Sequence, residues 1–161
     1  MRFEVYALPE DRIKQTLQQT IEANFSPLEG TAQGTLIADA SIPYLGIGIL
    51  KEPVRAKVKN GLITEIQGGE DARIIRVNLE RHGDPNCFNI AELGVGLNPA
   101  ARMCGIMLED EGVLAVVHKG SGTNITLGGK IKAPLHYDLL MWNPSLWLDG
   151  KLILKDGSLQ I

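Results

Sequence analysis

A small set of histidines and acidic residues in the second half of the chain has the types and spacing of metal ligands. His136 and Asp138 lie two positions apart in an apolar segment, and side chains two apart on a strand point to the same face. His118 follows the apolar run 113–117, so a neighbouring strand could add a second imidazole. Glu92 lies among small and apolar residues, where a buried carboxylate is costly unless it is paired or binds a metal. Such ligands suit zinc, iron(II), manganese or cobalt better than calcium.

Each of these residues also has a purely structural interpretation. A histidine beside an aspartate on a strand can be an ordinary hydrogen-bonded pair, and the H-x-D spacing is common by chance. Glu92 could instead face solvent at a sheet edge. His82, at the end of a predicted helix, is expected to cap that helix or to complement its dipole. Asp110 and Glu111 precede a glycine at a predicted turn, so we interpret both as solvated surface residues.

Length and composition indicate a single globular domain over residues 1–161, with 44% hydrophobic residues, 22% charged residues and a net charge of −3. The scattered lysines and arginines form no basic stripe, which argues against nucleic-acid binding. No apolar run approaches the roughly 20 residues of a membrane span, and the N-terminus lacks a signal-peptide hydrophobic region. We therefore expect a cytoplasmic protein without a membrane partner. Its two cysteines, Cys87 and Cys104, are expected to be buried free thiols.

Short apolar segments separated by turn signals dominate the chain. The patterns predict helices over 9–23 and 70–81, and strands over 2–7, 34–40, 46–50, 54–59, 62–67, 89–94, 113–118, 135–141, 146–148 and 152–154. Asn60-Gly61, Asp149-Gly150 and Asp156-Gly157 predict tight turns. After His118 we expect a glycine-rich loop. Together these elements predict an α+β fold, with a curved antiparallel or mixed sheet and two or three helices.

The order of the motifs resembles the C-terminal domain of the aminopeptidase T (thermophilic leucyl aminopeptidase) family of metallopeptidases. The succession contains NIAELGVGLNP, LEDE ahead of His118, the glycine-rich segment, APLHYD and finally LDGKLILKDG. The similarity covers roughly residues 25–157; each motif is weak alone, but their order and spacing are more specific. The resemblance implies a two-metal site held by two glutamates, two histidines and one aspartate, namely Glu22, Glu92, His118, His136 and Asp138.

The resemblance further implies a metal-dependent hydrolase, which would be a metalloaminopeptidase-like enzyme if active and would act on a small peptide. Zinc, cobalt or manganese would activate water, and Glu92 would bridge the metals or serve as the general base. Three departures indicate weak or lost peptidase activity. The chain lacks the family's N-terminal α/β domain, Lys119 follows the first histidine where a short aliphatic residue is usual, and the peptidases' tyrosine shortly after that histidine is absent.

Two other functions remain open. The same broad family includes iron(II) ring-cleaving dioxygenases of dihydroxypyridines, which use two histidines and one carboxylate. This chain retains that set as His118, His136 and Asp138, so a mononuclear iron(II) enzyme acting on a small molecule is one alternative. The other is a non-catalytic, stand-alone domain used for binding or oligomerisation. Such a domain would expose a surface that its relatives cover, so we expect a homo-oligomer, with Trp142 and Trp147 as candidate interface residues.

Overall fold

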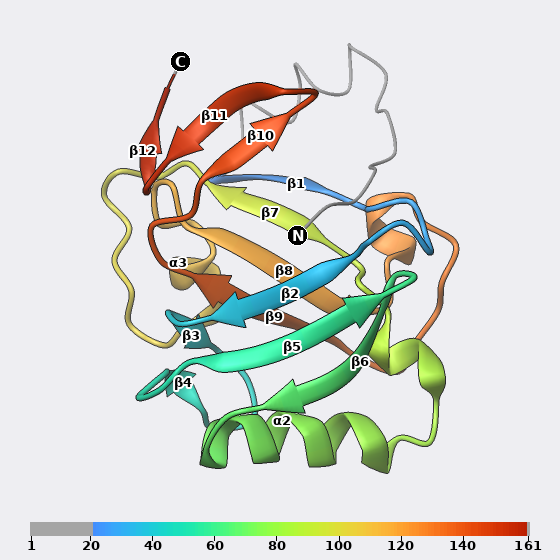
Figure 1. The fold of residues 1–161 in the computed structure, drawn as a ribbon. Coiled ribbons are helices and arrows are strands. Elements are labelled where there is room, and N and C mark those ends of the chain that lie inside the picture. Colours follow the sequence, from blue (N-terminus) through green and yellow to red (C-terminus); the bar gives the residue numbers. More distant parts are fainter. Residues whose placement is uncertain (1–20, 161) are drawn as a thin grey trace.

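The structure is a computed structural model that describes residues 21–160, and strands dominate it (Figure 1). One antiparallel sheet has the order β1-β7-β8-β9, made of β1 (Glu22–Phe25), β7 (Leu93–Gly96), β8 (Val117–Gly122) and β9 (His136–Met141). A second has the order β2-β5-β6, made of β2 (Gly34–Ala38), β5 (Val54–Lys59) and β6 (Leu62–Gln67). The other strands are β3 (Ser41–Ile42) paired with β4 (Gly48–Ile49), and the sheet of β10 (Leu146–Leu148), β11 (Lys151–Lys155) and β12 (Ser158–Leu159).

Two α-helices lie within the described residues, α2 (Glu70–Arg81) and α3 (Met107–Asp110), together with the 3₁₀ turns η1 (Pro85–Phe88) and η2 (Ile125–Leu127). Helix α2 runs beneath the β5–β6 pair (Figure 1) and buries Ala72, Ile75 and Leu79, which recur at helical spacing. These side chains join the largest apolar core. The α+β fold class is therefore confirmed, while the curvature of the sheet stays a prediction.

The two larger sheets are joined at β9. Backbone amides of Asp39 and Ala40 both donate to the carbonyl of Leu140, at 3.2 and 3.1 Å. One face of β9 presents Leu139 to the core beside α2, and the alternate face presents His136 and Asp138. His136 and Asp138 therefore share one face of β9 as predicted, and this face is buried at Asp138, which is only 3% exposed.

Most predicted strands and turns appear where the sequence placed them. Helix α2 begins and ends at the predicted residues. Asn60 and Gly61 take left-handed φ angles of 51° and 76° between β5 and β6, as a two-residue hairpin requires. Asp149-Gly150 and Asp156-Gly157 have the same pair of positive φ angles and join the C-terminal strands. Local turn chemistry therefore specified these connections.

Two predictions along the chain are wrong. Glu22 and Ala23 lie in strand β1 rather than in a helix over 9–23; residues 9–20 of that helix, like the strand over 2–7, fall outside the described residues. Strand β8 begins at Val117 and continues to Gly122, so the segment after His118 is a buried strand and not yet a loop. Ala115, with a φ of 63°, turns the chain before β8, which is why the apolar run 113–116 is not a regular strand.

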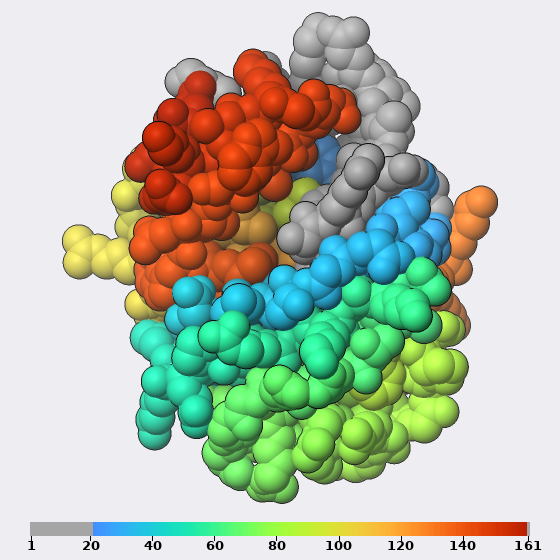
Figure 2. Space-filling model, viewed as in Figure 1, coloured from blue at the N-terminus to red at the C-terminus, as the bar shows by residue number. Residues whose placement is uncertain are grey.

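The C-terminal strands form a separate layer of the molecule. Figure 2 shows the segment that carries β10 to β12 at the opposite end of the visible face from α2 and the β5–β6 pair. Trp142 and Trp147, the candidate interface residues, are 41% and 57% exposed. The association that they would support stays a prediction.

Two further expectations concern membranes and cysteines. None of the helices between residues 21 and 160 combines the length and apolarity that crossing a membrane would require. Both cysteines are free, and Cys87 is buried as expected. Cys104 is exposed, so the expectation for that thiol is wrong.

Candidate metal centre

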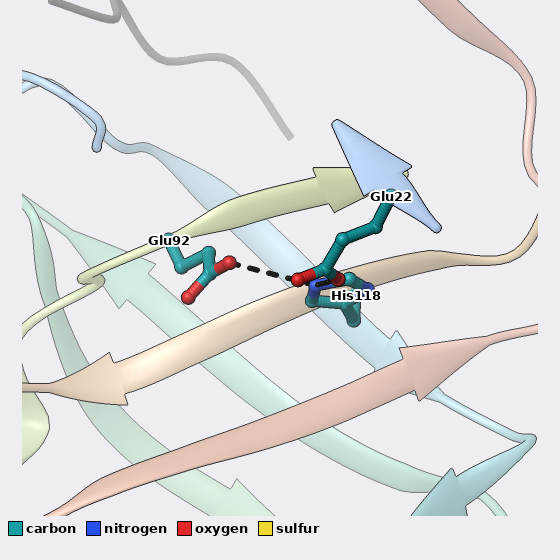
Figure 3. A group of neighbouring side chains, drawn as sticks. All are labelled: Glu22, Glu92 and His118. Carbon is teal, nitrogen blue, oxygen red and sulfur yellow. Dashed lines mark ion pairs between the residues drawn. The ribbon is translucent and has the colours of Figure 1, made fainter. Parts of the chain in front are cut away.

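The four strands of the β1-β7-β8-β9 sheet bring the five predicted ligands together. Glu22 begins β1, Glu92 immediately precedes β7, and His118 lies near the start of β8. His136 and Asp138 lie on β9. Figure 3 shows the carboxylates of Glu22 and Glu92 converging on the imidazole of His118. Glu22 thus meets His118, 96 positions away, because β1 pairs with β7 in an antiparallel register and β7 pairs with β8.

The candidate ligands form two groups that share Glu92. In the first group, Nε2 of His118 lies 3.1 Å from Oε2 of Glu22 and 3.6 Å from Oε1 of Glu92. In the second group, Nε2 of His136 lies 2.9 Å from Oε2 of Glu92 and 3.5 Å from Oδ1 of Asp138. Within each group, the ligand atoms all lie within 4.8 Å of one another. Each carboxylate oxygen of Glu92 therefore lies next to a different histidine.

Two strand glycines make room for these side chains. Gly94 lies directly opposite His118 in the β7–β8 register, and a Cβ atom there would lie 1.8 Å from Nε2 of the imidazole. A Cβ atom on Gly120 would lie 2.4 Å from Nε2 of His136 and 2.7 Å from Cβ of Glu92. A glycine inside a strand often marks such a close approach, so this signal was readable in the sequence.

Three of the predicted ligands each have one polar atom held by a neighbouring group. The other polar atom of each of these side chains points into the cluster. Nδ1 of His136 lies 2.7 Å from the carbonyl of Thr123, which orients Nε2 toward Glu92 and Asp138. Tyr44 donates its hydroxyl to Oδ2 of Asp138 at 2.8 Å. Asn24 donates its amide to Oε1 of Glu22 at 3.2 Å. Partners of this kind hold metal ligands in position in many metalloproteins.

The remaining atoms of these ligands are buried without a hydrogen-bond partner. They are Nδ1 of His118, Oε2 of Glu22 and Oδ1 of Asp138, of which the two oxygens have only the ion pairs with the histidines described above. Oε1 of Glu111, a further acidic residue that lines the site, also has no hydrogen-bond partner. Buried polar atoms without a hydrogen bond are costly, and a cation bound in the cluster would stabilise these carboxylate oxygens. The donor set and its burial therefore fit a divalent metal.

The electrostatics of the cluster hold both histidines in the charged form in the absence of metal. Burial opposes the imidazolium of His118, but Glu22 and Glu92 outweigh burial and raise its pKa to about 10. Burial likewise opposes the charge on His136, yet Asp138 and Glu92 raise its pKa to about 11. Burial opposes the ionisation of Glu92, but hydrogen bonds from the two histidines lower its pKa to about 2. Two protons thus balance part of the carboxylate charge.

The sequence did not indicate Tyr44, which precedes β4. Burial, followed by the charge of Asp138, raises the pKa of its hydroxyl, so the group stays a hydrogen-bond donor. Tyr44 thus supplies a hydroxyl donor to the site from a segment outside the four-stranded sheet. No local pattern around Tyr44 marks this role.

Asp110 and Glu111 are not surface residues, so that prediction is wrong. Asp110 is fully buried and accepts hydrogen bonds from Oγ of Ser41 at 2.6 Å and from the amides of Cys104 and Gly105. Glu111 lines the site, where burial and the carboxyl group of Asp138 raise its pKa to about 8. The LEDE motif ahead of His118 contains both residues, but its position at a predicted turn led to the expectation that their side chains face solvent.

Lys119 lies farther from the ligands than its position next to His118 suggests. It pairs with Leu139 across the β8–β9 register, so alternation directs it to the opposite face of the sheet from His118. Burial lowers the pKa of its amine well below the usual value, an effect that Glu92 partly offsets. It does not line the cavity.

A cavity of about 350 Å³ opens onto the ligands. Its lining combines four acidic residues and His136 with Tyr44, Asn24, Met107, Thr126 and Leu127. No lysine or arginine occurs among the described residues of this lining. The acidic excess favours a cation, and the cavity volume lies in the range of small-molecule sites.

Comparison with known proteins identifies the family. The sequence model described as "NicX: 2,5-dihydroxypyridine 5,6-dioxygenase" matches residues 20–161. The chain belongs to this family. A 2,5-dihydroxypyridine 5,6-dioxygenase of Pseudomonas putida KT2440 is 29% identical to it, with 81% of this chain and 40% of the relative covered. The NicX-family chain thus spans about two fifths of the length of the curated relative that it matches.

Solved structures agree on the fold. The 2,5-dihydroxypyridine dioxygenase from Pseudomonas putida KT2440 superposes with a TM-score of 0.77 at 27% identity, covering 85% of this chain and 42% of that structure. The aminopeptidase AmpT from Thermus thermophilus superposes with a TM-score of 0.66 at 16% identity, covering 88% of this chain and 40% of that structure. The second match supports a shared fold alone.

The hydrolase prediction is therefore wrong, because the family model and the curated relative both point to a dioxygenase. The resemblance to aminopeptidase T reflects a shared fold. One fold can carry different chemistries, and the ligand set alone does not choose between them. Dioxygenase membership implies a metal cofactor, which the geometry of the site fits.

Proposed function

We propose that this NicX-family chain carries the metal centre of an iron(II)-dependent dioxygenase that opens the ring of a dihydroxylated pyridine. His118, His136 and Asp138 supply the two imidazoles and one carboxylate that non-haem iron(II) oxygenases commonly use. Glu92, which contacts both imidazoles, orients them. Glu22 forms the adjacent group with His118 and Glu92 and holds the first histidine in place.

One observation carries this proposal: two carboxylates of the cluster have one oxygen hydrogen-bonded to the protein and a second, buried oxygen that forms no hydrogen bond. Asp138 accepts a hydrogen bond from Tyr44 at Oδ2, while its Oδ1 has only an ion pair with His136. Glu22 accepts a hydrogen bond from Asn24 at Oε1, while its Oε2 has only an ion pair with His118. A cluster that served only to hold the sheet together would complete these hydrogen bonds. Membership of the NicX family then favours iron and an aromatic substrate.

The residues around the cavity have chemistry suited to a hydroxylated ring. Met107 and Leu127 offer apolar contact to a ring, while Asn24 and Thr126 offer hydrogen bonds to its substituents. Bound iron(II) would supply the redox chemistry that ring opening by dioxygen requires. The lack of a described lysine or arginine in the lining favours a ring without a carboxylate substituent.

Anaerobic reconstitution with iron(II), followed by exposure to air and 2,5-dihydroxypyridine, tests the proposal. We expect loss of the ring absorbance with uptake of one dioxygen per ring, and no turnover by His136→Ala. A matched control is His82→Ala, because His82 is exposed at the end of α2 and lies outside the cluster. A chain that binds iron tightly and consumes no dioxygen with this substrate would refute the assigned reaction.

Metal content separates the iron(II) centre from a two-metal centre. The proposal predicts one iron per chain, lost in Asp138→Ala and retained in Glu22→Gln. Two equivalents of metal per chain, both lost with Glu92→Gln, would show that Glu92 bridges a pair of ions instead.

A further inference from the structure

Glu111 is the acidic residue of the site that none of the predicted ligand sets includes. It directly follows α3, a short helix that a hydrogen bond from Ser41 to Asp110 ties to β3, whereas all five predicted ligands come from the strands of the β1-β7-β8-β9 sheet or their edges. Its side chain lines the 350 Å³ cavity together with Glu22, Glu92 and Asp138. A segment outside this sheet thus adds a carboxylate to the cluster.

The fold holds this carboxylate in place through its neighbour. Asp110 accepts hydrogen bonds from Ser41, Cys104 and Gly105, which ties α3 to β3 and to the preceding loop. The carbonyl of Glu111 also packs so closely on β7 that a Cβ atom on Gly96 would lie 2.7 Å from it. Glu111 therefore enters the site from a fixed backbone.

One oxygen of its side chain has no hydrogen-bond partner. Oε1 of Glu111 is buried without a hydrogen-bond partner, and so is Oδ1 of Asp138, whose side chain is 5% exposed. The carboxyl groups of these two residues contact each other. Two ionised carboxyl groups in contact repel each other unless a proton or a cation lies between them. A cation fits here because the neighbouring histidines and carboxylates are also metal-binding groups.

We infer that Glu111 belongs to the ligand set of the proposed metal centre, as an additional carboxylate beside Asp138. The inference rests on the proposed function, since it requires that the centre bind metal. A fourth carboxylate in the cluster, which comes from outside the sheet, would increase the negative charge around the ion and couple metal binding to the position of α3.

The test compares metal binding by the metal-free full chain, Glu111→Gln and Glu109→Gln. Glutamine keeps the size of the side chain and can donate an N–H to Asp138, so it preserves a structural contact but removes the anionic ligand. Glu109→Gln is the matched control, because Glu109 lies on the same helix, is exposed and accepts a hydrogen bond from the amide of Arg102 that glutamine can also accept. Cobalt(II) is the probe, titrated by calorimetry and by its visible absorption.

We expect Glu111→Gln to weaken cobalt(II) binding about 10- to 100-fold and to change the visible spectrum of the bound ion, while Glu109→Gln matches the wild type. The metal-free Glu111→Gln protein should melt no lower than the wild type. Wild-type affinity and spectrum in Glu111→Gln would overturn the inference and leave the metal centre standing. A loss of melting temperature that is equal with and without cobalt(II) would assign a structural role and also overturn it. Failure of the wild type to bind cobalt(II) or iron(II) would refute the metal centre itself.

Discussion

Metal binding by this cluster should depend steeply on pH, because an ion must displace a proton from each of two histidines. The carboxylates around them raise the pKa of His118 to about 10 and that of His136 to about 11, so both are charged at neutral pH without metal. A histidine binds a metal only through a deprotonated nitrogen. The other titratable groups facing the two imidazoles are Glu22, Glu92, Glu111, Asp138 and Tyr44.

The magnitude follows from the number of protons released. With two protons displaced, the apparent association constant rises about 100-fold per pH unit near neutrality, which is about 2.7 kcal/mol. Glu111, with a pKa raised to about 8, can release part of a third proton below that pH, so the slope lies between two and three. The exchange of two protons for one divalent cation leaves the net charge of the cluster unchanged. Metal binding therefore adds no uncompensated charge to this buried site.

Titration calorimetry with cobalt(II) checks this prediction in two ways. The apparent dissociation constant is measured at pH 6.5, 7.0 and 7.5, and the proton count is obtained from buffers with different enthalpies of ionisation. His136→Gln should lower the count by one, because one imidazolium is removed. A count below one in the wild type would show that the histidines are neutral before metal binds and would refute the electrostatic reasoning.

Four further outcomes are expected. The melting temperature of the metal-free protein should be highest between about pH 4.5 and 6.5, because stabilisation from Glu92, whose pKa is lowered to about 2, is complete above its ordinary value of 4.5 and is lost toward pH 2. Stabilisation from His118 and His136 is complete below 6.5 and is lost as the pH rises toward 10 and 11. Gly94→Ala should weaken cobalt(II) binding at least about 10-fold and lower the free energy of unfolding in urea by about 1–3 kcal/mol, because its Cβ atom displaces the imidazole of His118. A leucyl anilide should not be hydrolysed with added cobalt(II) or zinc, measured by release of the chromogenic amine. The chain should behave as at least a dimer in light scattering, and Trp147→Lys should shift it toward the monomer, since Trp147 is 57% exposed.

The sequence by itself determined the elements whose signals are local. Helix α2 and the hairpin at Asn60-Gly61 appeared as predicted, because apolar spacing and the left-handed turn residues act within a few positions of the chain. The H-x-D pair of His136 and Asp138 shared one face of β9 for the same reason. Glu92 could be recognised as a buried carboxylate because its neighbours are apolar, and it is 6% exposed.

Only the tertiary structure decided which groups complete the site. Pairing of β1 with β7 brings Glu22 to a histidine 96 positions away, and no local pattern contains that register. Tyr44 and Glu111 reach Asp138 from segments outside the sheet, and their burial depends on packing between α3 and β3. The same limit explains the wrong enzyme class. Ligand types and spacing indicate a metal, but the reaction depends on the cavity and its lining, which long-range contacts assemble.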